Sequence, residues 1–204
     1  MNPAIKSRIQ AFRRAMELSA GDEAEACRDM ERWEEELQKF PRDSCELASN
    51  FLAQYLKDGN DTLCPYIIRL QTNNAFREAK ISRMESHYIV ALDGDYIDLT
   101  LDQFREHAEY VTGEPIESGG VLGELINTIR YHAGVDACSI QTLSVNVWGG
   151  KELYAWLSDK ADLLLKTDVQ SEGARAIGPL VSMNIQKNTA PQRTKDCRNN
   201  ITED

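Results

Sequence analysis

The sequence lacks the features that define several large classes of protein. No apolar run approaches the roughly 18 residues of a membrane-spanning helix, and no secretory signal peptide is recognisable. None of the five cysteines forms a C-x-x-C pair, which argues against a zinc ribbon or a thioredoxin-like site. The net charge of −10 argues against a general nucleic-acid binder, whose affinity rests on an excess of Lys and Arg. We therefore expect a reduced cytoplasmic protein with no membrane contact, no nucleic-acid partner, no cofactor and no metal site.

What is present is an ordinary globular composition with mixed secondary-structure patterns. The 204 residues, 42% of them hydrophobic, are enough to bury a core without disulfides or metal. We expect an α+β fold. It divides into an N-terminal helical segment at 1–40, a core at 41–112, a C-terminal α/β extension or small module at 113–186, and a disordered tail at 187–204.

Hydrophobic periodicity and turn residues predict the individual elements. The predicted helices span 3–19, 22–40, about 44–57, 101–108, 121–132 and 151–166. The predicted strands span 64–70, 86–92, 95–99, 110–112 and 140–148. Residues 71–84 fit either a mobile loop or a short helix. The glycine-rich segment 119–123 lacks the spacing and the Lys of a P-loop, so we interpret it as a loop and a helix start.

Cys45 falls at the start of a helix in the segment FPRDSCELASNFLAQYL. Asp43 is the predicted N-cap, and Glu46 completes a variant of the capping box. Cys45 then lies in the first helical turn, where unpaired backbone N–H groups and the helix dipole favour a thiolate. The same N–H groups suit an oxyanion formed by attack at this residue. The acidic neighbours work against the thiolate.

His87 and Asp98 belong to the clearest hairpin of the chain. A two-residue Asp93-Gly94 turn places Leu92 opposite Asp95, so that His87 and Asp98 become diagonal neighbours on one face. A hydrogen bond between the two side chains is then feasible. The opposite face is expected to form the core, and it carries Tyr88, Val90, Ile97 and Leu99. A thiol at a helix start, an imidazole and an orienting carboxylate are the parts of a cysteine nucleophile site.

The segments FPRDSC…ASNFLAQYL and SHYIVALDGDYIDLTLDQF resemble the papain-like, transglutaminase-like cysteine protease superfamily, including its small bacterial members of unknown role. The resemblance covers residues 40–112, about a third of the chain. It implies a nucleophile-bearing helix packed on a small antiparallel sheet. It also implies that Cys45 is the nucleophile, His87 the general base and acid, and Asp98 the residue that orients His87.

The chain departs from this family pattern around the nucleophile. Ser44 and Glu46 flank Cys45, where many relatives have glycine nearby. Papain-like enzymes use a glutamine shortly before the cysteine to stabilise the oxyanion. Gln38 is in range, although a helix-surface role suits it better, and Gln103 is a second candidate.

Two functions follow as hypotheses. The first is a cysteine-dependent hydrolase or acyltransferase that acts on an amide or ester through a thioester at Cys45, as a peptidase, amidase, deamidase or transglutaminase-like enzyme. Its expected partner is a protein or peptide substrate, basic or neutral because the chain is acidic. The alternative is a non-catalytic binding protein on the same scaffold, such as an effector, immunity or adaptor protein.

Overall fold

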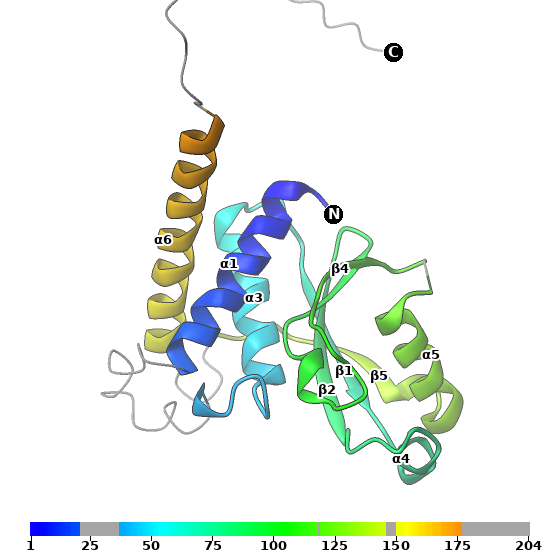
Figure 1. Cartoon of the computed structure of the whole chain (residues 1–204). Helices are drawn as coiled ribbons and strands as arrows, with labels where there is room; N and C mark the ends of the chain where they lie inside the picture. Colours follow the sequence, from blue (N-terminus) through cyan, green and yellow to red (C-terminus); the bar gives the residue numbers. More distant parts are fainter. Residues whose placement is uncertain (21–36, 118, 146–149, 177–204) are drawn as a thin grey trace, which may run out of the picture.

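One antiparallel sheet separates two groups of helices, which gives the chain an α+β architecture (Figure 1). The computed structural model describes residues 1–20, 37–117, 119–145 and 150–176. The helices are α1 (Pro3–Ala20), α3 (Cys45–Gly59), α4 (Asn74–Lys80), α5 (Val121–Ala133) and α6 (Lys151–Ala176). The strands are β1 (Tyr66–Gln71), β2 (Ser86–Leu92), β3 (Asp95–Asp98), β4 (Val111–Pro115) and β5 (Cys138–Gln141). Two short 3-10 turns, η2 (Leu101–Gln103) and η3 (Val135–Ala137), follow β3 and α5.

The strands lie in the order β4-β3-β2-β1-β5, and each neighbouring pair is antiparallel. β2 and β3 are joined by Asp93-Gly94, whose φ angles of 49° and 83° are both positive. Positive φ at both central residues is the requirement of a type I′ turn, which Asp-Gly meets well. The turn sets Leu92 opposite Asp95, so the predicted hairpin and its register are confirmed.

Both faces of the sheet are buried, against different helices. α1, α3 and α6 cover one face and pack on strand residues that include Val90 and Ile97. α4 and α5 cover the other face, where Ile89 and Tyr96 belong to a second buried cluster. The sequence predicts a core on the Val90 face. The face that carries His87 is buried as well, because alternating side chains of β2 and β3 supply two cores.

The start of α3 differs from the predicted capping box. Asp43 has a φ of 59° and precedes the helix, while Ser44 is the N-cap residue and makes no side-chain capping bond. The Ser44 hydroxyl donates instead to the carbonyl oxygen of Arg42. The prediction of Asp43 as the cap is therefore wrong, because the chain passes through the left-handed region there before the helix begins. Cys45 is nevertheless the first residue of α3.

Three further segments refine the predicted elements. The ambiguous segment 71–84 contains α4, which begins where the Asn73 side chain accepts the backbone N–H of Phe76. The helix predicted at 101–108 is reduced to the 3-10 turn η2. The strand predicted at 140–148 is wrong in its bounds, since β5 starts at residue 138 and ends at residue 141.

Some predictions fall on parts of the chain that the structure does not describe. Most of the helix predicted at 22–40 lies outside the described residues, and so does the tail at 187–204. The described part of the extension at 113–186 contributes β5 and most of β4, which are the two edge strands of the sheet. Its helix α6 packs in the same buried cluster as α1 and α3.

Arg13, on α1, is a buried cation that contacts the segment following β3. Its guanidinium donates to the carbonyl oxygen of Leu99 and to the two carboxylate oxygens of Asp102, at 3.1 and 2.7 Å for the latter pair. The same group lies over the rings of Phe40 and Tyr110. Arg13 therefore holds α1 against the loop that leaves β3.

Arg13→Ala is expected to lower the free energy of unfolding by about 2–4 kcal/mol, because it leaves buried acceptors without their donor. Arg14→Ala is the matched control, since the Arg14 side chain is 62% exposed and meets Glu17 at 3.4 Å. This control should change the free energy by less than about 0.5 kcal/mol. Urea titration of both variants measures the difference, and equal losses would contradict the role given to Arg13.

Candidate active site

His87 and Asp98 form a buried pair on neighbouring strands. His87 Nε2 lies 2.6 Å from Asp98 Oδ2, and both side chains are 0% exposed. The two residues are diagonal in the β2–β3 register, which follows from the Asp93-Gly94 turn. The hydrogen bond that the sequence makes feasible is therefore present. Because an ionised carboxylate only accepts hydrogen bonds, Nε2 is the ring nitrogen that carries a proton toward Asp98.

Asp98 is held in place by the chain that follows it. Its Oδ1 accepts the backbone N–H of Thr100 at 2.8 Å and the Thr100 hydroxyl at 3.2 Å. Together with the bond to His87, three donors converge on one carboxylate. The carboxylate cannot rotate without losing bonds to buried donors, which is costly. The orientation of the His87 ring is fixed as a result.

Cys45 meets this pair from the start of α3. Its side chain is partly exposed, and its thiol interacts with the imidazole of His87. Since Nε2 is bonded to Asp98, Nδ1 is the ring nitrogen left for the thiol. Nδ1 is buried and makes no hydrogen bond of normal geometry, so the thiol–imidazole contact is a loose one. Loose contacts of this kind are common in catalytic sites that hold no substrate.

The charge state of His87 results from two opposed effects. Burial alone would lower the pKa of His87, because an imidazolium loses its hydration. The nearby Asp98 carboxylate outweighs that effect through its charge and its hydrogen bond, and Cys45 acts in the same direction. The pKa of His87 is raised from 6.5 to about 10. The ring is therefore an imidazolium at neutral pH.

Cys45 opens onto a polar cavity of about 380 Å³, which we call the nucleophile pocket. The other residues that line it are Asp43, Glu46, Arg83, Met84, Glu85, Ser86, Tyr88, Gln103 and Phe104. The Phe104 ring also packs edge-on against His87, with 5.0 Å between the ring centroids. A molecule in the pocket can therefore reach the thiol directly, whereas the imidazole is shielded.

Gln103 connects the segment before Cys45 to the end of β3. Its Oε1 accepts the backbone N–H of Asp43 at 3.3 Å, and its Nε2 donates to the carbonyl oxygen of Thr100 at 2.9 Å. The Gln103 side chain thus links Asp43, two residues before Cys45, to Thr100, the residue that anchors Asp98. Gln38 is exposed and does not line the nucleophile pocket, so Gln103 is the glutamine that lies at this site.

A second cavity, of about 760 Å³, adjoins the first, and we call it the basic cleft. It shares the lining residues Asp43, Arg83, Gln103 and Phe104 with the nucleophile pocket. The others are Arg42, Lys80, Ile81, Arg105 and Glu106. Sequence reasoning missed this group of cations because they come from three separate segments and form no run of like charge.

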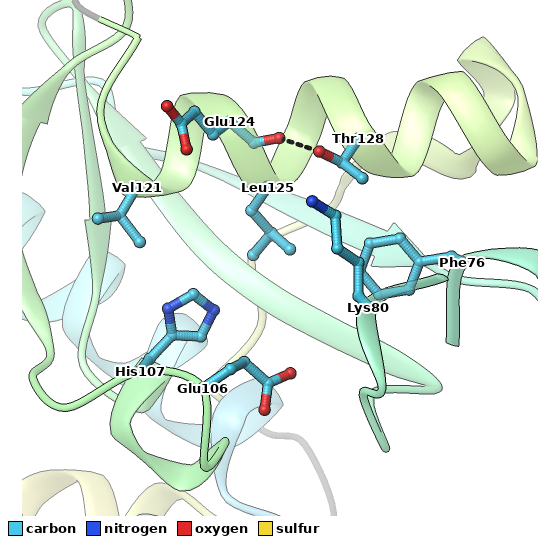
Figure 2. Close-up of a pocket in the computed structure, with 8 residues that line it drawn as sticks. All are labelled: Phe76, Lys80, Glu106, His107, Val121, Glu124, Leu125 and Thr128. Carbon is cyan, nitrogen blue, oxygen red and sulfur yellow. Dashed lines mark hydrogen bonds between the residues drawn. The ribbon is translucent and has the colours of Figure 1, made fainter. Parts of the chain in front are cut away.

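A third cavity, of about 280 Å³, lies between α4, α5 and the loop after η2 (Figure 2). Phe76 and Lys80 form one wall, His107 and Glu106 another, and α5 closes it from above in Figure 2. Lys80 and Glu106 line the basic cleft as well, so the two cavities are neighbours.

The glycine-rich loop before α5 holds an internal carboxylate. Glu114 accepts the backbone N–H groups of Leu122 and Gly123 at 3.1 and 2.9 Å. This arrangement satisfies the first turn of α5 in the way that a capping residue would. It agrees with the interpretation of the glycines as a loop and helix start. Among the described residues, no cluster of His, Cys, Asp and Glu is grouped to hold a metal ion.

Comparison with known proteins finds relatives of this chain that are uncharacterized. No protein-family model and no solved structure matches it. The chain is 35% identical over 127 residues to YuaU of Escherichia coli K12, described as an uncharacterized protein, and equally to YuaU of strain UTI89. The matched region is 62% of this chain and 54% of YuaU, so the chain spans about half the length of these relatives. Within the described residues, no helix is long and apolar enough to cross a membrane.

The raised pKa of His87 predicts a specific dependence of stability on pH. A group whose pKa is higher in the folded state stabilises the fold fully below pH 6.5, and this contribution is lost as the pH rises through about 10. Between these values it falls by up to about 1.4 kcal/mol per pH unit. Asp98→Asn removes the main cause of the raised pKa. The stability difference between the two proteins should therefore be largest at low pH.

Urea titrations of wild type and Asp98→Asn at several pH values from 6 to 9 measure this difference. Comparison with the variant cancels the titration of other groups. A difference that stays constant or grows with pH would show that His87 is not an imidazolium held by Asp98.

Ile81, which lines the basic cleft, provides a second prediction. It ends α4 with φ 53° and ψ 36°, a left-handed conformation that β-branched residues avoid, and it is 92% exposed. Ile81→Gly should raise the free energy of unfolding by about 1 kcal/mol, because glycine adopts this conformation without strain. Val135→Gly is the control, since Val135 is 73% exposed but has no positive φ. This control should be neutral or destabilising, and a gain in both variants would contradict the strain at Ile81.

Proposed function

We propose that this chain is a cysteine-dependent hydrolase or acyltransferase that acts on an amide or ester. Cys45 is the nucleophile, His87 the general base and acid, and Asp98 the residue that orients the imidazole. The observation that carries the proposal is the buried hydrogen bond between His87 Nε2 and Asp98, which leaves Nδ1 for the thiol of Cys45. A pocket that opens onto the thiol adds the access that a substrate needs.

The reaction begins with attack of the Cys45 thiolate on the carbonyl carbon of the substrate. The new C–S bond forms as the carbonyl oxygen becomes an oxyanion, and His87 is then an imidazolium. When the tetrahedral intermediate collapses, the C–N or C–O bond breaks and the leaving group takes a proton from His87. The product of this half-reaction is a thioester on Cys45 and a neutral imidazole.

Water or an amine then resolves the thioester. His87 takes a proton from the incoming nucleophile, the C–S bond breaks, and the thiolate–imidazolium pair is restored. Water as the nucleophile gives hydrolysis or deamidation, whereas an amine gives transamidation. Asp98 keeps the charge of the imidazolium compensated in both half-reactions, while its bonds to Thr100 keep it in place.

Backbone N–H groups in the first turn of α3 are the natural donors for the oxyanion. Cys45 is the first helical residue, and Ala48 is the residue whose N–H bonds back to the carbonyl of Ser44. The N–H groups before Ala48 precede this first intrahelical bond and point out of the helix start. Gln103 supplies the remaining candidate, because one hydrogen of its amide is left after the bond to Thr100.

Phe104 limits the access of a leaving group to His87, the proposed general acid. His87 is fully buried, and the Phe104 ring packs against the imidazole in a T-shaped arrangement while it lines the pocket. A leaving group that receives the proton of His87 therefore has to pass or displace Phe104. The pair is buried beneath neighbours that include Phe104, which protects its charge interaction from screening by water.

The packing of α3 supports a papain-like, transglutaminase-like arrangement. The nucleophile helix lies on one face of an antiparallel sheet, and the His and Asp occupy adjacent strands of that sheet. The order Cys, His, Asp along the chain fits the same pattern. The activity, substrate and partners of the whole protein are part of this proposal.

Iodoacetamide labelling of Cys45 tests the proposal, because a thiolate paired with an imidazolium is alkylated where an ordinary thiol is not. We expect Cys45 to be labelled at pH 6 at least about tenfold faster than Cys64, which is exposed and has no such partner among the described residues. His87→Ala should remove most of this advantage. The rates are measured by mass spectrometry of the labelled peptides.

Exposure alone cannot explain the expected result, because Cys64 is the more exposed of the two cysteines. The proposal would be contradicted if Cys45 is labelled slowly, with the pH profile of an ordinary thiol, and if His87→Ala does not change this rate. The alternative of a non-catalytic binding protein would then account for the pocket better.

A further inference from the structure

The basic cleft brings four cations together beside the nucleophile pocket. Arg42 lies three residues before the start of α3, Lys80 ends α4, Arg83 follows it, and Arg105 lies just after η2. All four side chains are exposed. The fold therefore assembles a positive surface next to Cys45 from segments that are far apart in the sequence.

The charge of this cleft is opposite to that of the chain. The protein carries 33 acidic and 23 basic residues, yet the cleft has four cations against two acids, Asp43 and Glu106. Within the described residues, none of the four cations is in a salt bridge. Unpaired like charges repel one another, so the cleft is a site that an anion stabilises.

The nucleophile pocket has the opposite balance. Among the residues that the structure describes, Asp43, Glu46 and Glu85 line it, and Arg83 is the one basic lining residue. A substrate that spans both cavities therefore meets negative charge beside the thiol and positive charge in the adjoining basic cleft. Its reacting group must be uncharged or cationic, and its anionic groups must lie several atoms away.

Ile81 suggests the form of that substrate. It lines the basic cleft, and an isoleucine that is 92% exposed in a strained conformation offers an apolar contact at a cost to the stability of the free protein. An apolar contact beside four cations suits a peptide that carries both carboxylates and aliphatic groups. A nucleic acid fits less well, because its continuous phosphate backbone would also meet Asp43, Glu46 and Glu85 in the adjoining pocket.

We infer that the basic cleft binds an acidic peptide segment of the substrate, with its carboxylates on Arg42, Lys80, Arg83 and Arg105, while a neighbouring carbonyl lies at Cys45. This inference rests on the proposed function. It revises the expectation of a basic or neutral substrate, which follows from the net charge alone. The local charge of the cleft decides what binds there, since exposed charges beyond about 10 Å are screened in physiological salt.

Two affinity labels test the inference: bromoacetyl-Gly-Glu-Glu-Glu-amide and its glutamine counterpart, bromoacetyl-Gly-Gln-Gln-Gln-amide. In each, the Cys45 thiolate displaces bromide and forms a thioether, while the side chains reach beyond the glycine. We expect the glutamate peptide to label Cys45 at least about tenfold faster than the glutamine peptide at low ionic strength. The ratio should fall toward one at about 0.5 M salt.

Two triple variants locate the effect. Arg42→Gln, Lys80→Gln and Arg105→Gln together should bring the ratio of glutamate to glutamine labelling close to one. Lys6→Gln, Lys57→Gln and Lys151→Gln together remove the same charge from exposed positions that line neither cavity, and should preserve the ratio. Circular dichroism checks that both variants are folded.

A wild-type ratio near one would overturn the inference, and so would an equal loss of the ratio in both triple variants. Iodoacetamide, which has no peptide, reports on the nucleophile alone. Slow iodoacetamide labelling with an intact peptide ratio would refute the proposed function and leave the acidic-peptide cleft standing. Fast iodoacetamide labelling with a peptide ratio near one would support the proposed function and refute the acidic-peptide cleft.

Discussion

The hydrogen bond between His87 and Asp98 is the interaction on which the rest of the site depends. It joins two side chains with no exposure to solvent, so each would be a costly buried group without the other. The tight Asp93-Gly94 turn sets the register that makes the bond possible, and Thr100 fixes the carboxylate. Once Nε2 is engaged, the ring presents Nδ1 to Cys45. A one-residue change in the turn would move one member of the pair to the opposite face of the sheet.

Local sequence signals were enough to predict this pair. An Asp-Gly turn, alternating side chains and a thiol at a helix start each act over a few residues, and they indicated that Asp98, His87 and Cys45 could lie together. The N-cap could not be predicted, because Asp43 adopts a left-handed conformation in which its backbone N–H donates to Gln103, a residue 60 positions away in the sequence. The second core was missed for a related reason. Nothing in β2 alone says that α4 and α5 will cover its other face.

The net charge of the sequence and the local charge of the basic cleft have opposite signs. Net charge is a sum over the chain, whereas a cleft is charged by the few side chains that the fold gathers. Arg42 and Arg105 are 63 positions apart and line the same cavity. The acidic surroundings of Cys45 and the basic cleft beside them give the site a direction along which a bound peptide would align. The same arrangement keeps the carboxylates of a bound peptide away from the thiol.

The most direct test of the central claim is a long-range ¹H–¹⁵N spectrum of the His87 ring at pH 8, before and after alkylation of Cys45. The account predicts that both ring nitrogens are protonated before alkylation, because the pKa of His87 is raised to about 10. It also predicts that alkylation changes the Nδ1 signal much more than the Nε2 signal, which Asp98 holds. A neutral imidazole at pH 8, or an Nδ1 signal that does not respond to alkylation, would contradict the account.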